Sequence, residues 1–319
     1  MTKQTDNTRN EQGTNERSAN ERSANGQSAN GESANGESAN GESANGESAT
    51  VLVTSATGKT GRRVAERLTA RGVTVRAGSR SGSTPFDWEA PETWGPALRG
   101  ADAAYVAYYP DLAAPGGVQA METFGRLAAE HGVRRLTVLS GRGEPEAVVA
   151  EEALRAAAVG VELTVVRAAF FAQNFSEGLL AEGVAEGVVV FPAGDTAEPF
   201  IDVDDLADVV VETLTTEGHA GRVHELTGPR PIGFAEVAAE ISRASGRPVV
   251  YQPVSRSEYA GMLTGFGLPA PEAGWLAALF ATLLDGHNAS VTDGVKRVLG
   301  REPRSFGAFA DATWAGEEA

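Results

Sequence analysis

An alternation of short apolar runs with amphipathic stretches between residues 50 and 170 is the feature that most constrains how this chain can fold. The apolar runs are expected as strands at residues 50–54, 73–79, 83–88, 102–109, 133–140 and 161–170. The amphipathic stretches are expected as helices at residues 61–72, 91–100, 116–132 and 144–160. This alternation is typical of right-handed βαβ units, so we expect an α/β fold with a parallel sheet and ligands beyond the carboxyl ends of its strands.

The stretch VLVTSATGKTG, residues 51–61, has the composition of a phosphate-binding loop. A nucleoside-triphosphate loop needs a glycine five positions before its Gly-Lys-Thr, where this chain has Val53. A dinucleotide loop fits better, because Gly58 lets the backbone approach a pyrophosphate and Gly61 lets the following helix pack close to the strand. Ser55 stands where a glycine is usual; it costs little at a negative φ, but its side chain narrows the approach on the adenosine side. We therefore expect a Rossmann-type, doubly wound sheet.

The end of the second expected strand indicates which dinucleotide is bound. A site for NAD usually has an acidic residue there, whereas this chain has Ser79 and Arg80. Arg80 can pair with a 2′-phosphate as a planar fork, Ser79 can donate a hydrogen bond, and Lys59 adds positive charge. These residues favour NADP(H), with NAD(H) as the second choice. The alternative is that Arg80 is a solvated loop arginine.

The first 49 residues are set apart by a five-residue repeat. From Asn15 the chain reads NERSA twice, NGQSA once and NGESA four times, and no bulky apolar residue follows Met1 in this stretch. Burial therefore cannot offset the entropy of ordering the chain, and we expect a disordered low-complexity tail over residues 1–49. The tail is interpreted as a dispensable repeat, with a solubilising or tethering role as the alternative. It lacks the basic start and apolar centre of a signal peptide.

Composition argues against several classes of protein. The net charge is −16 and no cluster of Lys and Arg is present, so we expect no nucleic-acid partner. No apolar run reaches the roughly 18 residues of a membrane span, so we expect no membrane association. The chain has no cysteine, which removes disulfides and thiolate chemistry and is compatible with a cytoplasmic location.

Several segments together resemble the NmrA-like group of atypical short-chain dehydrogenases/reductases. They are residues 53–68, 78–98, 134–143, 165–175 and 198–209. Two further segments, 77–94 and 284–306, are similar to the branch of this group that contains the fungal ergot-alkaloid imine reductases. The resemblance implies the fold named above and a nicotinamide cofactor.

The same resemblance implies a domain organisation and a set of cofactor contacts. Residues 50–319 are expected to form one NAD(P)-binding domain, with its dinucleotide-binding core at about 50–170. A smaller C-terminal α/β substrate-lid region is expected mainly at 171–200 and 222–319. The implied contacts are Thr54, Thr57, Gly58, Lys59, Thr60, Gly61, Ser79 and Arg80, with Asp87 near the adenine and Ser140 at the end of the fifth strand. Ser55, from the same loop, is also expected to contact the cofactor.

The chain lacks the Tyr-x-x-x-Lys pair with which short-chain dehydrogenases typically protonate an alkoxide. Its three lysines are Lys3, Lys59 and Lys296, and none stands four residues after a tyrosine. We therefore expect acceptors that need little proton donation, such as an iminium, which becomes a neutral amine, or a quinone or flavin, which delocalises the charge. The catalytic residues stay unknown, and the candidates are Tyr108, Tyr109 and Ser140.

Residues after the fourth and sixth expected strands are predicted to face the crevice where a nicotinamide lies. Tyr108 and Tyr109 either stack on the cofactor or substrate, or form part of the core or the pocket wall. The substrate pocket is expected to be lined by Tyr109, Phe170, Phe171 and Asn174. Asn174 has an alternative interpretation as the cap of the next helix.

Two other patterns are better explained without a ligand. The four histidines are scattered, and His219 and His224 are five residues apart, so we expect no metal site. Asp202 stands three residues before Asp205 and ahead of an apolar helical pattern. We expect it to cap a helix rather than to form a carboxylate site.

Two functions remain open from the sequence. The first is an NADPH-dependent oxidoreductase that transfers hydride to an electron-poor small molecule, such as an imine or iminium, a quinone or a related secondary-metabolite intermediate. The second is a non-catalytic NADP(H)-binding redox sensor that signals to a partner protein, as some NmrA-like proteins are thought to do. For either function we expect a monomer or a homodimer.

Overall fold

A parallel sheet of seven strands organises the part of the chain that the computed structural model describes, residues 49–316. The tail expected at residues 1–49 lies outside this range, apart from Ala49. The strand order is β3-β2-β1-β4-β5-β6-β9, and every pair of neighbours is parallel. The strands are β1 Thr50–Val53, β2 Thr74–Ser79, β3 Thr84–Pro85, β4 Ala103–Val106, β5 Arg135–Gly141, β6 Glu162–Ala168 and β9 Val223–Leu226. The expected Rossmann-type α/β fold is confirmed.

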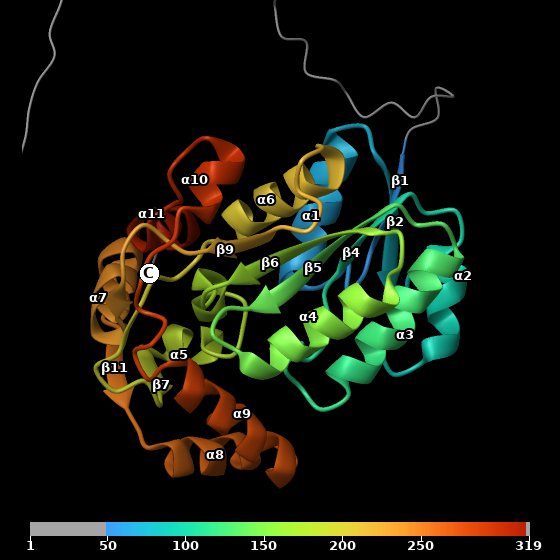
Figure 1. Ribbon diagram of the computed structural model, residues 1–319. Helices are drawn as coiled ribbons and strands as arrows, with labels where there is room; N and C mark the ends of the chain where they lie inside the picture. Colours follow the sequence, from blue (N-terminus) through green and yellow to red (C-terminus); the bar gives the residue numbers. More distant parts are fainter. Residues whose placement is uncertain (1–48, 317–319) are drawn as a thin grey trace, which may run out of the picture. The chain divides into compact units, whose positions relative to one another are not determined.

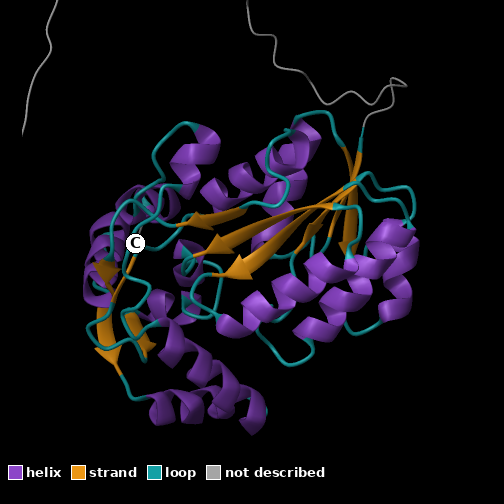
Figure 2. Ribbon diagram, viewed as in Figure 1, coloured by secondary structure: helices purple, strands orange, loops and turns teal. Residues whose placement is uncertain are grey.

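Helices cover both faces of this sheet, as Figures 1 and 2 show. On one face lie α1 (Lys59–Ala70) and α6 (Val203–Thr215), which pack against each other. On the other face lie α3 (Gly117–Glu130) and α4 (Pro145–Ala157), with η1 (Pro91–Thr93) and α2 (Trp94–Leu98) beside α3. Because both faces are covered, the central strands are mostly buried, and β4 is buried along its whole length.

The polypeptide after β6 adds further helices and two small sheets. The helical elements are η2 Ala172–Phe175, α5 Ala181–Glu186, α7 Phe234–Ser245, α8 Arg256–Gly265, α9 Ala270–Leu283, α10 Gly294–Leu299 and α11 Phe306–Trp314. The small sheets pair β7 (Val188–Phe191) with β11 (Val250–Pro253) and β8 (Ala197–Glu198) with β10 (Ile232–Gly233). A core rich in phenylalanine joins most of these elements. Within the stretch expected as a lid, β9 instead forms an edge of the main sheet.

The predicted helix cap at Asp202 is confirmed. Its side chain accepts a hydrogen bond of 2.8 Å from the Asp204 N–H at the start of α6. The same carboxylate accepts from the Gln173 side chain at 2.7 Å, so the cap also ties α6 to η2.

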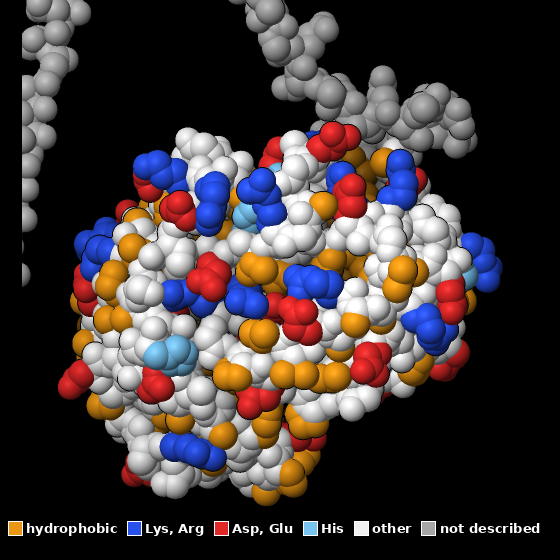
Figure 3. Space-filling model, viewed as in Figure 1, with side chains coloured by type: hydrophobic (Ala, Val, Ile, Leu, Met, Phe, Trp, Pro, Cys, Tyr) orange, Lys and Arg blue, Asp and Glu red, His pale blue; other side chains and the backbone are white. Residues whose placement is uncertain are grey.

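Charged side chains are interspersed on the face seen in Figure 3, with acidic and basic groups side by side. Many form ion pairs, such as Arg67 of α1 with Asp204 and Asp208 of α6. None of the helices within residues 49–316 is long and apolar enough to cross a membrane.

The start of α1 lies directly on the turn after β1, and this contact depends on Gly61. A Cβ added to Gly61 would lie 2.8 Å from the carbonyl carbon of Ser55 and still closer to its oxygen. The predicted role of Gly61, close packing of helix against strand, is confirmed. Val64 and Leu68, four residues apart on the inner side of this helix, are fully buried.

Replacing Gly61 by alanine should therefore destabilise the fold. We expect Gly61→Ala to lower the free energy of unfolding by about 1–3 kcal/mol, the usual cost of overpacking, because the backbone must shift to admit the methyl group. Denaturant unfolding measures this change. Gly261→Ala is the matched control, since nothing lies within 4 Å of its new Cβ on the exposed side of α8. The control should be neutral or stabilising by up to about 1 kcal/mol, and equal losses in both variants would contradict the explanation.

Candidate functional site

The start of α1 offers unpaired backbone amides at the carboxyl end of β1. Gly58 is the N-cap residue, and no side chain between residues 49 and 316 caps this helix start. The Gly58 N–H is bound to the Ser55 carbonyl at 2.8 Å, and both Thr57 and Gly58 are exposed. The first amides of a helix have no partner within the helix, and its dipole is positive here, so the turn can bind an anion.

Ser55 adopts the conformation in which a serine is costly. Its φ is +49°, in the left-handed region that favours glycine, and not the negative value at which a serine costs little. The turn therefore keeps the backbone shape that the usual glycine gives, and the serine is compensated by a hydrogen bond. Its Oγ donates to the carbonyl of Ala107, after β4, at 2.9 Å. The side chain thus contacts the end of β4.

Thr54, an implied cofactor contact, is fully buried and has its own partners. Its Oγ1 accepts from the Ala107 N–H at 2.8 Å and lies 3.1 Å from the Tyr105 carbonyl, to which it donates. The side chain holds β1 to the end of β4 and is not presented to a ligand. Thr60 is likewise buried, at 7% exposure, so among the threonines of the loop only Thr57 is exposed.

The end of β2 presents the residues expected at a 2′-phosphate. Arg80 is exposed and pairs with no carboxylate among residues 49–316, and Ser79 precedes it at the strand end. Asp87 lies further along, and its carboxylate accepts from the Glu89 N–H at 3.1 Å, which shapes its own turn. The structure therefore leaves Arg80 available, while the Asp87 side chain is engaged locally.

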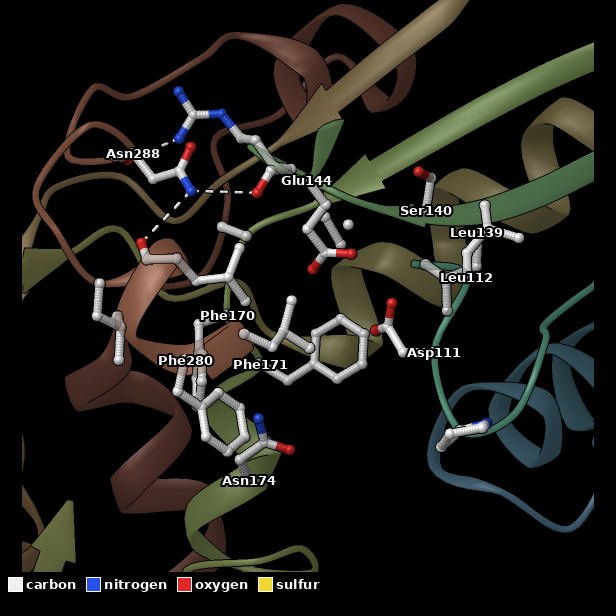
Figure 4. A pocket seen from close by; sticks show the side chains of 18 of the residues that line it. Asp111, Leu112, Leu139, Ser140, Glu144, Phe170, Phe171, Asn174, Phe280 and Asn288 are labelled. Atoms are coloured by element: carbon white, nitrogen blue, oxygen red, sulfur yellow. Dashed lines mark hydrogen bonds between the residues drawn. The ribbon is translucent and has the colours of Figure 1, made fainter. Parts of the chain in front are cut away.

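A cavity of about 300 Å³ lies at the carboxyl ends of β4, β5 and β6, closed on one side by α9 (Figure 4). Its apolar wall consists of Leu112, Leu139, Phe170, Phe171, Trp275, Leu276, Leu279, Phe280, Leu283 and Leu284. Phe170, Phe171 and Asn174 line it where the sequence predicted a pocket. The cavity adjoins the start of α1, because Lys59 lines it too.

The two tyrosines after β4 are separated by the structure. Tyr108 lines the cavity and packs edge-to-face on Trp88, with ring centroids 5.1 Å apart. Burial raises the pKa of Tyr108, and the nearby Glu89 raises it further, so its phenol is a poorer acid than usual. Tyr109 is 74% exposed and does not line the cavity, because the chain bends at this residue after the end of β4. The placement of Tyr109 in the pocket is corrected accordingly.

Ser140 lines the cavity but does not present its hydroxyl to it. The side chain is buried and donates to Glu151 Oε1 at 2.6 Å, and Figure 4 shows it directed away from the cavity. Glu151 is fully buried and bound by Arg167 at 2.7 and 2.9 Å. The Ser140 proton is therefore engaged in a hydrogen bond to Glu151, which is itself bound by Arg167, and this makes Ser140 a poor candidate for proton donation.

Lys59 points into the cavity and not toward the end of β2, where we expected its charge. Its Nζ donates to Asn174 Oδ1 at 2.6 Å. Burial lowers the pKa of Lys59, with Glu177 acting in the opposite sense. The interpretation of Asn174 as a helix cap is wrong, since α5 has Leu180 at its N-cap position and the amide of Asn174 binds Lys59.

Three carboxyl groups in the cavity were missed by sequence reasoning. Asp111 follows β4, Glu144 precedes α4, and Glu198 ends β8. Burial raises the pKa of both Asp111 and Glu144, and the negative charge of Asp111 raises the pKa of Glu144 further. Burial also raises the pKa of Glu198 to about 7, although the Phe170 N–H and the charges of Arg142 and His287 oppose this. Asp111 and Glu144 follow neighbouring strands, and this position is the signal by which sequence could have found them.

The histidines and acids do not form a metal centre. Among residues 49–316 no group of three His, Asp or Glu side chains is arranged to hold a metal ion. His219 and His224, which the sequence separates by five positions, hydrogen-bond to each other through ring nitrogens 3.1 Å apart.

Comparison with known proteins identifies the family, although no family model matches the chain. The chain is 33% identical to the uncharacterised oxidoreductase YesF of Bacillus subtilis over 278 residues, which cover 82% of this chain and 94% of that protein. It is 32% identical to an NAD(P)H azoreductase of Xenophilus azovorans, covering 78% and 85% of the two chains. It is 30% identical to agroclavine dehydrogenase of Claviceps fusiformis, covering 82% and 96%. The chain belongs to the NmrA-like atypical short-chain dehydrogenases/reductases. This is a family of oxidoreductases, and the resemblance found in the sequence is confirmed.

A solved structure shows the same fold. The NADPH complex of the quinone oxidoreductase from Escherichia coli matches with a TM-score of 0.66 at 21% identity, covering 82% of this chain and 99% of that one. The likeness shows the fold of an NmrA-like reductase over nearly all of the described range.

The buried Glu198 should make stability depend on pH. Its pKa in the folded protein, about 7, lies above the usual value of 4.5, so the folded state holds this proton more tightly than the unfolded state. Its contribution is fully present below pH 4.5 and is lost as the pH rises through 7. Between pH 4.5 and pH 7, we expect the free energy of unfolding of wild type to fall by about 3 kcal/mol more than that of Glu198→Gln. Urea unfolding at several pH values measures this difference.

Glu182→Gln, at an exposed position on α5, is the control for that measurement. It should follow the wild-type pH dependence. A Glu198→Gln profile parallel to that of wild type would contradict a raised pKa at Glu198.

Proposed function

We propose that this protein is an NADPH-dependent oxidoreductase that transfers hydride to an electron-poor small molecule, such as an imine or iminium, a quinone or a related secondary-metabolite intermediate. The observation that carries the proposal is the continuity of the uncapped α1 start with the aromatic cavity. A dinucleotide has an anionic pyrophosphate next to its nicotinamide, and the site has an anion-binding turn next to an apolar pocket. The membership of the chain in a family of oxidoreductases supports the same reading.

The residues present fit a dinucleotide phosphate. Gly61 lets α1 begin directly on the turn, Gly58 is exposed at the start of the helix, and no side chain of residues 49–316 caps the α1 amides. At the end of β2, Arg80 and Ser79 provide a cation and a hydroxyl group for a 2′-phosphate. When bound, the reduced dinucleotide supplies hydride. The chain supplies binding, orientation and the exclusion of water by the aromatic wall.

The relatives support this class of reaction. Relatives named as an NAD(P)H azoreductase and an agroclavine dehydrogenase are oxidoreductases, and the structural neighbour is a quinone oxidoreductase bound to NADPH. Calorimetric titration with NADPH, NADP⁺ and NADH, followed by turnover assays with quinones and cyclic imines, tests the proposal. Micromolar binding of NADPH with no turnover of any acceptor would instead favour a redox sensor, the second function left open by the sequence.

Arg80 is expected to select NADPH over NADH. Removing the guanidinium in Arg80→Ala should weaken NADPH binding by about 1.5–3 kcal/mol, the range for a hydrogen bond to a charged group. NADH has no 2′-phosphate, so its affinity should hardly change and serves as the internal control. Calorimetry with both cofactors measures the two changes. Equal weakening of both would show that Arg80 has a structural role only.

The turn should depend on close backbone approach more than on the lysine charge. Gly58→Val should abolish NADPH binding while the protein stays folded, because a branched Cβ would fill the space next to the amides. Lys59→Ala should weaken binding by only about 1 kcal/mol, since Lys59 is a partly exposed charge whose amine is directed to Asn174. Circular dichroism checks the fold, and calorimetry with NADPH and ATP measures binding. Tolerance of Gly58→Val together with loss of binding in Lys59→Ala would point to a triphosphate loop.

A further inference from the structure

Two carboxyl groups from different parts of the chain meet in the cavity. Asp111 lies in the loop that leaves β4, and Glu144 stands at the N-cap position of α4, after β5. Both line the cavity, and Figure 4 shows their side chains converging on it from opposite sides. Glu144 is only 5% exposed and Asp111 is partly buried. Neither belongs to the dinucleotide loop, and neither was among the catalytic candidates.

The contact between these carboxyls requires a proton. An ionised carboxylate only accepts hydrogen bonds, so two carboxyls can hydrogen-bond to each other only when one is protonated. Asp111 and Glu144 line the same cavity closely enough for each to shift the pKa of the other, and the buried Glu144 Oε2 has no hydrogen-bond partner within the described residues, so it can share a proton with Asp111. The pair therefore behaves as one acid that keeps a single shared proton.

The surroundings of the pair favour retention of that proton. Burial is the main cause of the raised pKa of Glu144, and the negative charges of Glu146 and Glu151 on α4 act in the same sense. The one opposing contact is the Ala113 N–H, which donates to Asp111 at 2.8 Å. The other charged groups facing the cavity are Lys59 from α1, Glu198 from β8 and Arg142 from the β5–α4 loop.

Neither nearby cation neutralises the pair. Lys59 donates to Asn174 at 2.6 Å. The Arg142 guanidinium donates to the carbonyl of Asn288 and to Ser290, both at 2.7 Å. Both cations that line the cavity are therefore bound to groups other than the two acids.

We propose that the Asp111–Glu144 pair is the proton donor to the acceptor that binds in this cavity. The proposal rests on the proposed oxidoreductase function and adds to it the group that the missing Tyr-x-x-x-Lys pair leaves unassigned. Hydride addition to a neutral C=N, C=O or N=N bond brings two electrons and leaves a negative charge on nitrogen or oxygen. The shared proton moves to that atom, an N–H or O–H bond forms, and the carboxyl O–H bond breaks. The pair is left with both carboxylates ionised and regains one proton from water after the product leaves.

This donor changes which acceptors the site can reduce. Without it, the chemistry would be restricted to acceptors that need little protonation, such as iminium ions and quinones. With it, neutral imines, carbonyls and azo compounds also become suitable. A cationic iminium takes hydride to give a neutral amine and needs no proton, so it bypasses the pair. The two acceptor types therefore separate proton donation from every other role of the residues.

The test compares a neutral cyclic imine, 3,4-dihydroisoquinoline, with its N-methyl iminium salt at a pH where the imine is uncharged. Glu144→Gln should lower kcat/KM for the neutral imine by about 100-fold, within the range for general acid catalysis. For the iminium salt it should change kcat/KM by less than about 3-fold, since no proton is transferred. Asp111→Asn should give the same contrast, which keeps the test open if one variant folds poorly. Glu152→Gln removes an exposed charge on the same helix that is not among the charges raising the pKa of Glu144, and it is the matched control.

A readout independent of turnover is the titration of ¹³C-labelled Asp and Glu carboxyls in the protein without cofactor. Wild type and Glu152→Gln should show a carboxyl signal that titrates above pH 7, and this signal should disappear in Glu144→Gln. Titration of both Asp111 and Glu144 as ordinary acids would overturn the proposal. Equal loss of activity on both acceptors would also overturn it, because it would indicate a binding or structural role. Wild type that binds no NADPH or reduces neither acceptor would refute the proposed function, and with it the donor role, whatever the titration shows.

Discussion

The contact between the Ser55 carbonyl and Gly61 determines where every part of the site lies. Because Gly61 has no Cβ, α1 begins directly on the turn after β1 and brings its first amides to the strand end. Ala107, after β4, ties the same turn down, since its backbone binds Thr54 and its carbonyl accepts from Ser55 and from the Trp88 indole at 2.9 Å. The phosphate-binding turn and the start of the cavity wall are thus one hydrogen-bonded unit. A backbone shift at Gly61 would therefore move both.

Local patterns predicted the sheet, its helices and the Asp202 cap, because each depends on residues close in sequence. Apolar periodicity, together with the residues that end helices and strands, located the strands of the core in their order along the chain. The observed ends of these strands differ from the predicted ones by only a few residues. The dinucleotide turn was predictable for the same reason, since its glycines act on their immediate neighbours. The φ of Ser55 was not, because a serine in the left-handed region needs an external partner, and that partner, the Ala107 carbonyl, belongs to another strand.

The side-chain directions within the site depend on contacts between distant segments, and here sequence reasoning failed. Lys59 was expected at the 2′-phosphate but is drawn into the cavity by Asn174, which lies 115 residues away. The Ser140 hydroxyl was a candidate donor, but Glu151 on α4 holds its proton. The carboxyls of the cavity come from three separate loops and strands, with no spacing that a motif could capture. The sequence indicated only that Asp111 and Glu144 follow neighbouring strands of the sheet.

A cavity for an aromatic ligand does not need buried acids, so their presence calls for a physical reason. Phenylalanine and leucine walls alone would bind an apolar ring, and each buried carboxyl lowers stability at neutral pH through desolvation. The adjoining phenylalanine core, in which Phe170 contacts Phe191, Phe200, Phe234 and Phe280, can absorb that loss by its packing. The same packing keeps water from the acids and so holds their protons at pH values where an exposed carboxyl is ionised. An oxidoreductase without a tyrosine–lysine pair needs a protonated group of this kind when its acceptor is neutral. The apolar wall and the acids therefore depend on each other, because the wall that binds the ligand also keeps the acid protonated.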